Sequence, residues 1–99
     1  MIRQITLIKF KEGVNQLSYN TMESGLASLV DVVPGLLRFE FGPDLNLEDD
    51  TFDYALVIDF ESEQVWHSYR SHPDHIAFAE QAMELIKDVK RVQYQPNRI

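Results

Sequence analysis

The sequence predicts one α+β domain, a four-stranded antiparallel sheet with helices packed on one of its faces. The chain has 99 residues, a size typical of a single domain. Segments with strand-like alternation are interspersed with segments of helical spacing, in the order β-α-β-β-α-α-β. This order is that of a ferredoxin-like fold. We therefore expect a single domain over residues 1–99.

The first half of the chain predicts a strand, a helix and a second strand. Ile2–Phe10 is rich in Ile, Leu, Thr and Phe, the residues that strands favour. Asn15–Val32 has apolar residues at helical spacing and begins with a good N-cap residue. Pro34-Gly35 ends this helix, and Leu36–Pro43 forms the next strand.

The second half predicts a strand, two helices and a last strand. Thr51–Phe60 alternates apolar residues on one face. Residues 62–69 form a short helix capped by Ser62, and a longer helix runs from Pro73 to Leu85. Val89–Tyr94 is the last strand. The longer helix is expected to turn three residues toward the sheet: Ile76, Ala79 and Met83.

Both faces of the predicted sheet are apolar. On the first strand Ile8 and Phe10 point one way, and Ile5 and Leu7 point the other. The helices can cover only one face of a sheet with this topology. We therefore expect a second copy of the chain on the other face, giving a homodimer in which two sheets form an α+β barrel.

Composition excludes several classes of function. The formal net charge of −7 argues against nucleic-acid binding, which needs clustered Lys and Arg. The chain has no cysteine, so disulfides and cysteine nucleophiles are absent. No apolar run approaches the roughly 18 residues of a membrane span, and the first residues do not form a signal peptide. We expect a cytoplasmic protein with neither a nucleic-acid nor a membrane partner.

The segment "YRSHPDHIAF" holds two of the three histidines. Proline is favoured at the first helical position, so Pro73 places His72 at the helix cap and His75 in the first turn. The helix dipole disfavours a positive charge there, so a neutral His75 can act as a general base. Two alternatives stay open: the pair serves only to order the helix start, or it binds a metal, although no third ligand is evident.

A few polar groups are expected to converge between the sheet and the helices. Gln4 is polar on an otherwise apolar strand face, so it meets water or lines a cavity. Aromatic residues with polar tips surround it, as in small-ligand sites. The expected pocket residues are Gln4, Tyr54, Trp66, Tyr69, His72 and His75. If Trp66, Phe78 and Met83 fill this space instead, the domain is a bare dimerisation module.

Five segments, taken together and in order, resemble the stress-responsive A/B barrel (Dabb) family. They are "ITLIKFKEGV", "VVPGLLRFEFGPDL", "FDYALVIDFES", "YRSHPDHIAF" and "VKRVQYQP", and they span essentially the whole chain. The combination of K-F-K, the P-G before the second strand and H-P-x-H is more specific than any one of them. The resemblance implies a ferredoxin-like fold and a homodimeric barrel.

The resemblance also implies a ligand class and two roles. Most family members have no assigned reaction, but the chain is distantly similar to olivetolic acid cyclase, a plant member that closes a polyketide by aldol condensation without a cofactor. Its catalytic histidine and tyrosine fall on His75 and Tyr69, whereas its other pocket residues are replaced by Gln4, Tyr54 and Leu26. One expectation is a homodimer with a pocket for a small hydrophobic carbonyl or phenolic compound and no assigned reaction. The alternative is a cofactor-independent cyclase or lyase-type enzyme acting on a polyketide-like carbonyl compound.

A cation site is implied in the same way. Some plant members hold magnesium through backbone carbonyls at the end of the first helix. The matching positions here are Val30, Val33 and Leu36. Carbonyl oxygens suit a hard cation. No other cofactor is expected.

Overall fold

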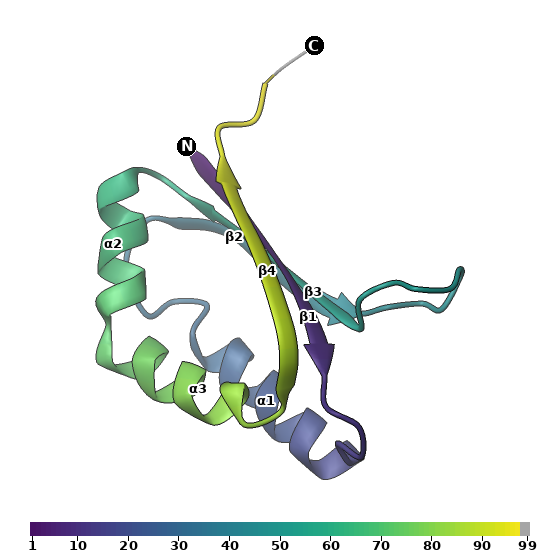
Figure 1. Cartoon of the computed structure of the whole chain (residues 1–99). Coiled ribbons are helices and arrows are strands. Elements are labelled where there is room, and N and C mark those ends of the chain that lie inside the picture. Colours follow the sequence, from purple (N-terminus) through teal and green to yellow (C-terminus); the bar gives the residue numbers. More distant parts are fainter. Residues whose placement is uncertain (98–99) are drawn as a thin grey trace.

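The computed structural model describes residues 1–97, and it has the predicted order of elements. These elements are β1 (Ile2–Phe10), α1 (Gln16–Ser28), β2 (Leu36–Pro43), β3 (Tyr54–Phe60), α2 (Glu63–Ser71), α3 (Pro73–Met83) and β4 (Ile86–Tyr94). The sheet has the order β2-β3-β1-β4, and every neighbouring pair is antiparallel (Figure 1). The predicted ferredoxin-like α+β fold is therefore confirmed. Within residues 1–97, no helix is long and apolar enough to cross a membrane.

The first helix is shorter than predicted. Its start is as expected, because the Asn15 side-chain oxygen accepts a hydrogen bond of 2.8 Å from the Ser18 amide. It ends at Ser28 and does not continue to Val32. The Leu29 amide donates a hydrogen bond to the Leu26 carbonyl, three residues back and not four as in an α-helix. The chain then enters a turn. Gly35 completes this turn with φ of +93°, a conformation that other residues rarely adopt.

The inward face of α3 also differs from the prediction. Ile76 is 46% exposed and Met83 is 49% exposed, so neither faces the sheet, although Ala79 does. The face turned toward the sheet carries His75, Phe78, Ala79 and Ala82, which also follow helical spacing. The following strand begins at Ile86, before the predicted Val89, and β3 begins at Tyr54, after the predicted Thr51.

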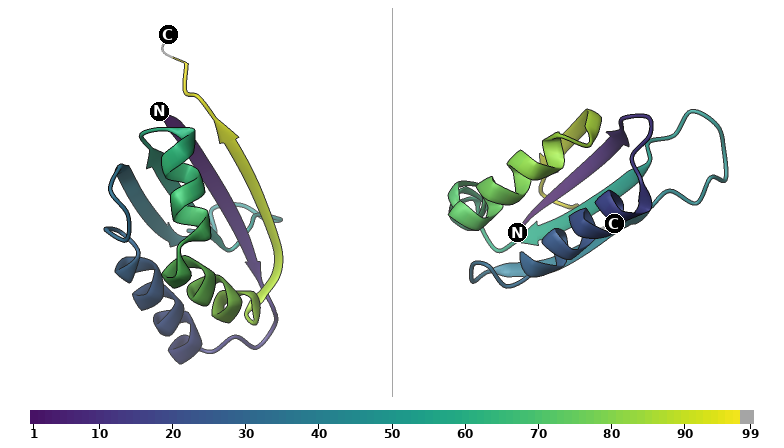
Figure 2. Two further views of the ribbon diagram at one scale, coloured as in Figure 1. Left: turned by 90° about the vertical axis from the view of Figure 1, so that its left-hand side faces the viewer. Right: turned by 90° about the horizontal axis from the view of Figure 1, so that it is seen from below.

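The helices cover one face of the sheet, which we call the covered face (Figure 2). Along β3 the residues pointing to this side, Tyr54, Leu56, Ile58 and Phe60, are all buried. They pack against Met22 and Leu26 of α1, Leu29 just after it, and Tyr69 of α2. The hydrophobic core of the domain thus lies entirely between this face and the helices.

No helix of the described residues packs on the opposite face, which we call the open face (Figure 2). Its centre is nevertheless apolar. Leu7 is 36% exposed and Val92 is 50% exposed. The apolar residues of the open face are Ile5, Leu7, Ala55, Val57 and Val92. Such a patch in a charged protein marks a surface for contact.

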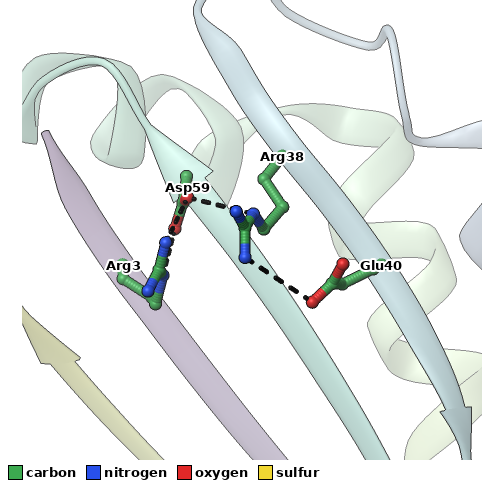
Figure 3. A network of polar contacts seen from close by, with 4 residues as sticks. All are labelled: Arg3, Arg38, Glu40 and Asp59. Atoms are coloured by element: carbon green, nitrogen blue, oxygen red, sulfur yellow. Dashed lines mark hydrogen bonds and ion pairs between the residues drawn. The ribbon is translucent and has the colours of Figure 1, made fainter.

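A row of charged side chains crosses one end of the open face (Figure 3). The Arg3 guanidinium donates two hydrogen bonds to the Asp59 carboxylate, at 2.7 and 2.9 Å. Arg38 lies 3.4 Å from the same carboxylate and 3.8 Å from Glu40. Asp59 is only 4% exposed because the two arginines lie over it. The hydrogen bonds from Arg3 hold the pKa of the Asp59 carboxyl below its usual range.

Candidate functional site

A partly enclosed cavity of about 100 Å³ lies between the covered face and the helices. Its walls come from β1, β3, β4 and all three helices. Larger hollows of about 780, 550 and 470 Å³ lie under the 44–53 loop, between α1 and α3, and beside Trp66 and Gln93. Of the four, only the partly enclosed cavity is lined by buried polar side chains, Gln4 and Thr6, together with a histidine. Enclosure with a few polar groups is typical of small-ligand sites.

His75 is placed in the cavity wall by the first turn of α3. Its Nδ1 lies 3.2 Å from the backbone carbonyl oxygen of Arg70. Because a carbonyl oxygen only accepts hydrogen bonds, Nδ1 carries the proton of the neutral ring, and Nε2 keeps a lone pair. Burial, followed by the charge of Arg70, lowers the pKa of His75 from its ordinary value of 6.5. The imidazole is therefore neutral at pH 7 and has the protonation state of a general base.

Tyr69 lies beside His75, with the two ring centroids 4.6 Å apart. Tyr69 lies in the last turn of α2 and is only 2% exposed. Burial raises the pKa of Tyr69 to about 12, and the charge of Arg70 opposes this rise. The hydroxyl thus stays protonated at neutral pH and can donate a hydrogen bond to a ligand oxygen.

Gln4 forms the polar floor of the cavity. Its side-chain oxygen accepts hydrogen bonds of 2.9 Å from the Trp66 indole and from the Gln93 amide. An indole N–H can only donate, so the amide orientation of Gln4 is fixed, with its nitrogen toward Thr6 at 3.4 Å. Trp66 therefore positions Gln4 and does not line the cavity.

Two further residues of the expected pocket lie outside the cavity lining. The Tyr54 hydroxyl donates to Glu23 at 2.7 Å, and its ring packs against Tyr19. His72 caps α3, where its Nδ1 accepts a hydrogen bond of 3.0 Å from the Asp74 amide. The structure therefore separates the two histidines of the motif: one orders the helix, and the other faces the cavity.

Sequence reasoning missed two arginines of the site. Arg70 lies in the last turn of α2 near His75, and Arg91 lies on β4 directly opposite Thr6. Both line the cavity. The alternation of β4 could have placed Arg91 on the same side as Val89, but nothing in the sequence pairs Arg91 with Arg70.

Metal ligands of the side-chain kind are not grouped in the described part of the chain. Residues 1–97 contain no cluster of three His, Cys, Asp or Glu that could hold an ion. The three positions of the expected magnesium site lie on one short connection, with Val30 and Val33 between α1 and β2 and Leu36 at the first residue of β2.

Comparisons with known proteins agree with this fold. Residues 2–96 match the family described as "Stress responsive A/B Barrel Domain". The chain is 26% identical over 100 residues to the Arabidopsis thaliana "Stress-response A/B barrel domain-containing protein HS1", covering 99% of this chain and 92% of that protein.

Two solved structures are similar along nearly the whole chain. One is a dimeric ferredoxin-like protein of unknown function from Thermobifida fusca, with a TM-score of 0.88, 30% identity and coverage of 94% of this chain and 88% of that one. The other is a hydroxynitrile lyase from Passiflora edulis, with a TM-score of 0.88, 19% identity and coverage of 99% and 94%. The second likeness is one of fold alone.

Proposed function

The chain belongs to the stress-responsive A/B barrel domain family, and on this premise we propose that it is a homodimer that binds a small hydrophobic carbonyl compound in this cavity. The observation that carries the proposal is the neutral His75 beside Tyr69 in a cavity with a buried polar floor. A group that only stabilised the fold would find its partners within the protein. Here the lone pair of Nε2 is left for a ligand.

The open face supports the homodimer. Its apolar centre lies on the three strands β1, β3 and β4 and has no helix over it. The similar protein from Thermobifida fusca is described as dimeric. Packing a second sheet on this face removes the exposed side chains of Leu7 and Val92 from water, which favours association.

Ligand binding is tested by nuclear magnetic resonance titration with butanone, which has a carbonyl group and a short apolar chain. We expect butanone to move the signals of Tyr69 and His75, and the response to disappear in His75→Ala. His67→Ala is the matched control, because His67 is an exposed histidine on α2 and lies away from the cavity. Absence of any response at millimolar concentrations of butanone would refute the pocket.

A cofactor-independent enzyme is the second candidate, and the hydrogen bond from His75 Nδ1 to the Arg70 carbonyl favours it. Nε2 would remove a proton from the carbon beside a substrate carbonyl, and the C–H electron pair would form an enolate. The Tyr69 hydroxyl would hydrogen-bond to the enolate oxygen. Return of the proton from His75 to the enolate would complete an exchange. Alternatively, the enolate would attack a second carbonyl, and the new alkoxide oxygen would take the proton from His75.

Enolisation is tested by exchange of the α-hydrogens of butanone in deuterated water. We expect His75→Ala to abolish the catalysed exchange and Tyr69→Phe to slow it about tenfold or more, since one oxyanion donor is lost. Circular dichroism and light scattering check that both variants stay folded and dimeric. Binding without catalysed exchange in the wild-type protein would leave the first candidate and remove the second.

The magnesium site at Val30, Val33 and Leu36 remains a proposal that rests on the family resemblance. It predicts that millimolar Mg²⁺ raises the melting temperature, because an ion bound only by the folded state stabilises it. An unchanged melting temperature with Mg²⁺ and with a chelator would contradict it.

A further inference from the structure

Two arginines form the rim of the partly enclosed cavity. Arg91 is exposed and Arg70 is half-buried, whereas Gln4 and Thr6 at the floor are buried. The register of β4 with β1 places Arg91 opposite Thr6, and therefore on the covered face. The end of α2 brings Arg70 to the same cavity. A ligand entering toward His75 must pass or contact these guanidinium groups.

The rim has no acidic side chain to balance these charges. Among residues 1–97, no Asp or Glu lines the cavity, and neither arginine forms an ion pair. The chain as a whole has 16 acidic residues and 9 Lys or Arg. A rim with two arginines and no acidic residue is therefore unlike the chain as a whole. On the open face, by contrast, Arg3 and Arg38 share the carboxylate of Asp59.

The two arginines are held near each other by the fold. The Arg70 guanidinium lies 5.7 Å from the centre of the Trp66 ring, a cation–π contact, and Trp66 is itself bonded to Gln4. Burial, together with the charge of Arg70, lowers the pKa of the Arg91 guanidinium. Two like charges at one rim repel each other, and an anion bound between them would relieve this repulsion.

We propose that this rim binds the carboxylate of a small amphipathic ligand whose short apolar end enters the cavity. The inference rests on the proposed function and specifies its ligand class. Guanidinium groups match a carboxylate in both charge and hydrogen-bond geometry. Between the rim and the polar floor much of the wall is apolar, with Ile8, Leu26 and Leu56 among its residues. Its volume of about 100 Å³ is below the roughly 150 Å³ that holds a benzene ring. It therefore suits a chain of a few carbon atoms.

The test compares ligands of equal shape and different charge on the full chain. Butanoate and butanamide have the same carbon skeleton, and inorganic phosphate is an anion without an apolar end. We expect butanoate to bind about fivefold more tightly than butanamide, the modest gain of partly exposed charges. Added sodium chloride should reduce this preference. Phosphate should bind more weakly than butanoate.

Matched variants locate the effect at the rim. Arg91→Gln should remove most of the preference for butanoate over butanamide, and Arg91→Lys should restore part of it. Lys90→Gln is the control, because it removes the same charge from the next residue, which points to the open face. Lys90→Gln should keep the wild-type preference.

The outcomes separate this inference from the proposed function. Equal binding of butanoate and butanamide, with signals of Tyr69 and His75 moving for both, overturns the anionic ligand and leaves the pocket. Phosphate binding as tightly as butanoate overturns the requirement for an apolar end. No response to butanoate or butanamide overturns both the inference and the pocket.

Discussion

The polar side chains on the two faces of the sheet differ in whether they have partners within the chain. On the open face, the Asp59 carboxylate takes two hydrogen bonds from Arg3 and lies close to Arg38, so these charges are satisfied within one protomer (Figure 3). On the covered face, His75 keeps a free ring nitrogen, and Arg70 faces the cavity without an acidic partner in the described chain. Charges that are paired within the chain need no ligand, whereas polar groups without such partners are available to one.

The largest effect is expected at the centre of the open face. Val57→Glu would place one carboxylate from each protomer at the proposed dimer interface, next to Glu40 on the neighbouring strand. A buried charge without a partner costs about 4 kcal/mol, so the dimer should dissociate at micromolar concentration. Light scattering measures this. Leu17→Glu, at an exposed position on α1, should leave the dimer intact.

A slightly smaller effect is expected one residue further along β3. Ile58 points into the core of the covered face and is 0% exposed. Ile58→Ala should lower the free energy of unfolding by about 3 kcal/mol, because it leaves a cavity in a packed core. Urea unfolding measures the loss. Val57→Ala should lower dimer affinity more than it lowers stability within a protomer. If Val57→Ala and Ile58→Ala lowered the free energy of unfolding equally, the distinction between the two faces would be wrong.

The charged row of the open face should contribute less. Asp59→Asn removes the carboxylate that Arg3 and Arg38 share, with an expected loss of about 1 kcal/mol, since the arginines stay near water. The folded-state pKa of Asp59 lies below the unfolded value of 3.8. Its contribution is therefore complete above pH 3.8 and is lost as the pH falls through the folded-state pKa. The free energies of unfolding of the wild-type protein and of Asp59→Asn, measured in urea, should therefore converge in acid.

The smallest effect is expected from the titration of His75. Its folded-state pKa lies below 6.5, so the unfolded chain binds its proton more readily. The folded state should lose stability as the pH falls from 6.5 toward the folded-state pKa. His75→Gln should lack this loss, and thermal melts from pH 7 to pH 5 compare the two proteins. If the melting temperatures of the wild-type protein and of His75→Gln changed in parallel with pH, His75 would not be shielded from water.

The order of the elements followed from the sequence, but the inward face of α3 did not. Two sets of residues on this helix share helical spacing, and only one contains the large apolar residues Ile76 and Met83. The fold turns inward the set formed by His75, Phe78, Ala79 and Ala82, in which the small alanines let the helix lie near the cavity. Spacing alone cannot choose between two overlapping stripes when each contains a large apolar residue.

The candidate site was predictable where its residues lie close in sequence. Pro73 separates His72 from His75, which follows from helix geometry alone, and Tyr69 is near both. The bond between Gln4 and Trp66 joins residues far apart in the chain, as does the rim formed by Arg70 and Arg91. Such contacts depend on strand register and on the position of α2, which local pattern does not determine.

The most direct test of the account is the nitrogen spectrum of the His75 ring at pH 7. We expect a neutral imidazole with its proton on Nδ1, and an Nε2 signal that moves when butanone or butanoate is added. The same measurement on Tyr69→Phe checks that the ring keeps its orientation without the neighbouring hydroxyl. A protonated ring, or a proton on Nε2 in the free protein with no response to either compound, would contradict a base left open to a ligand.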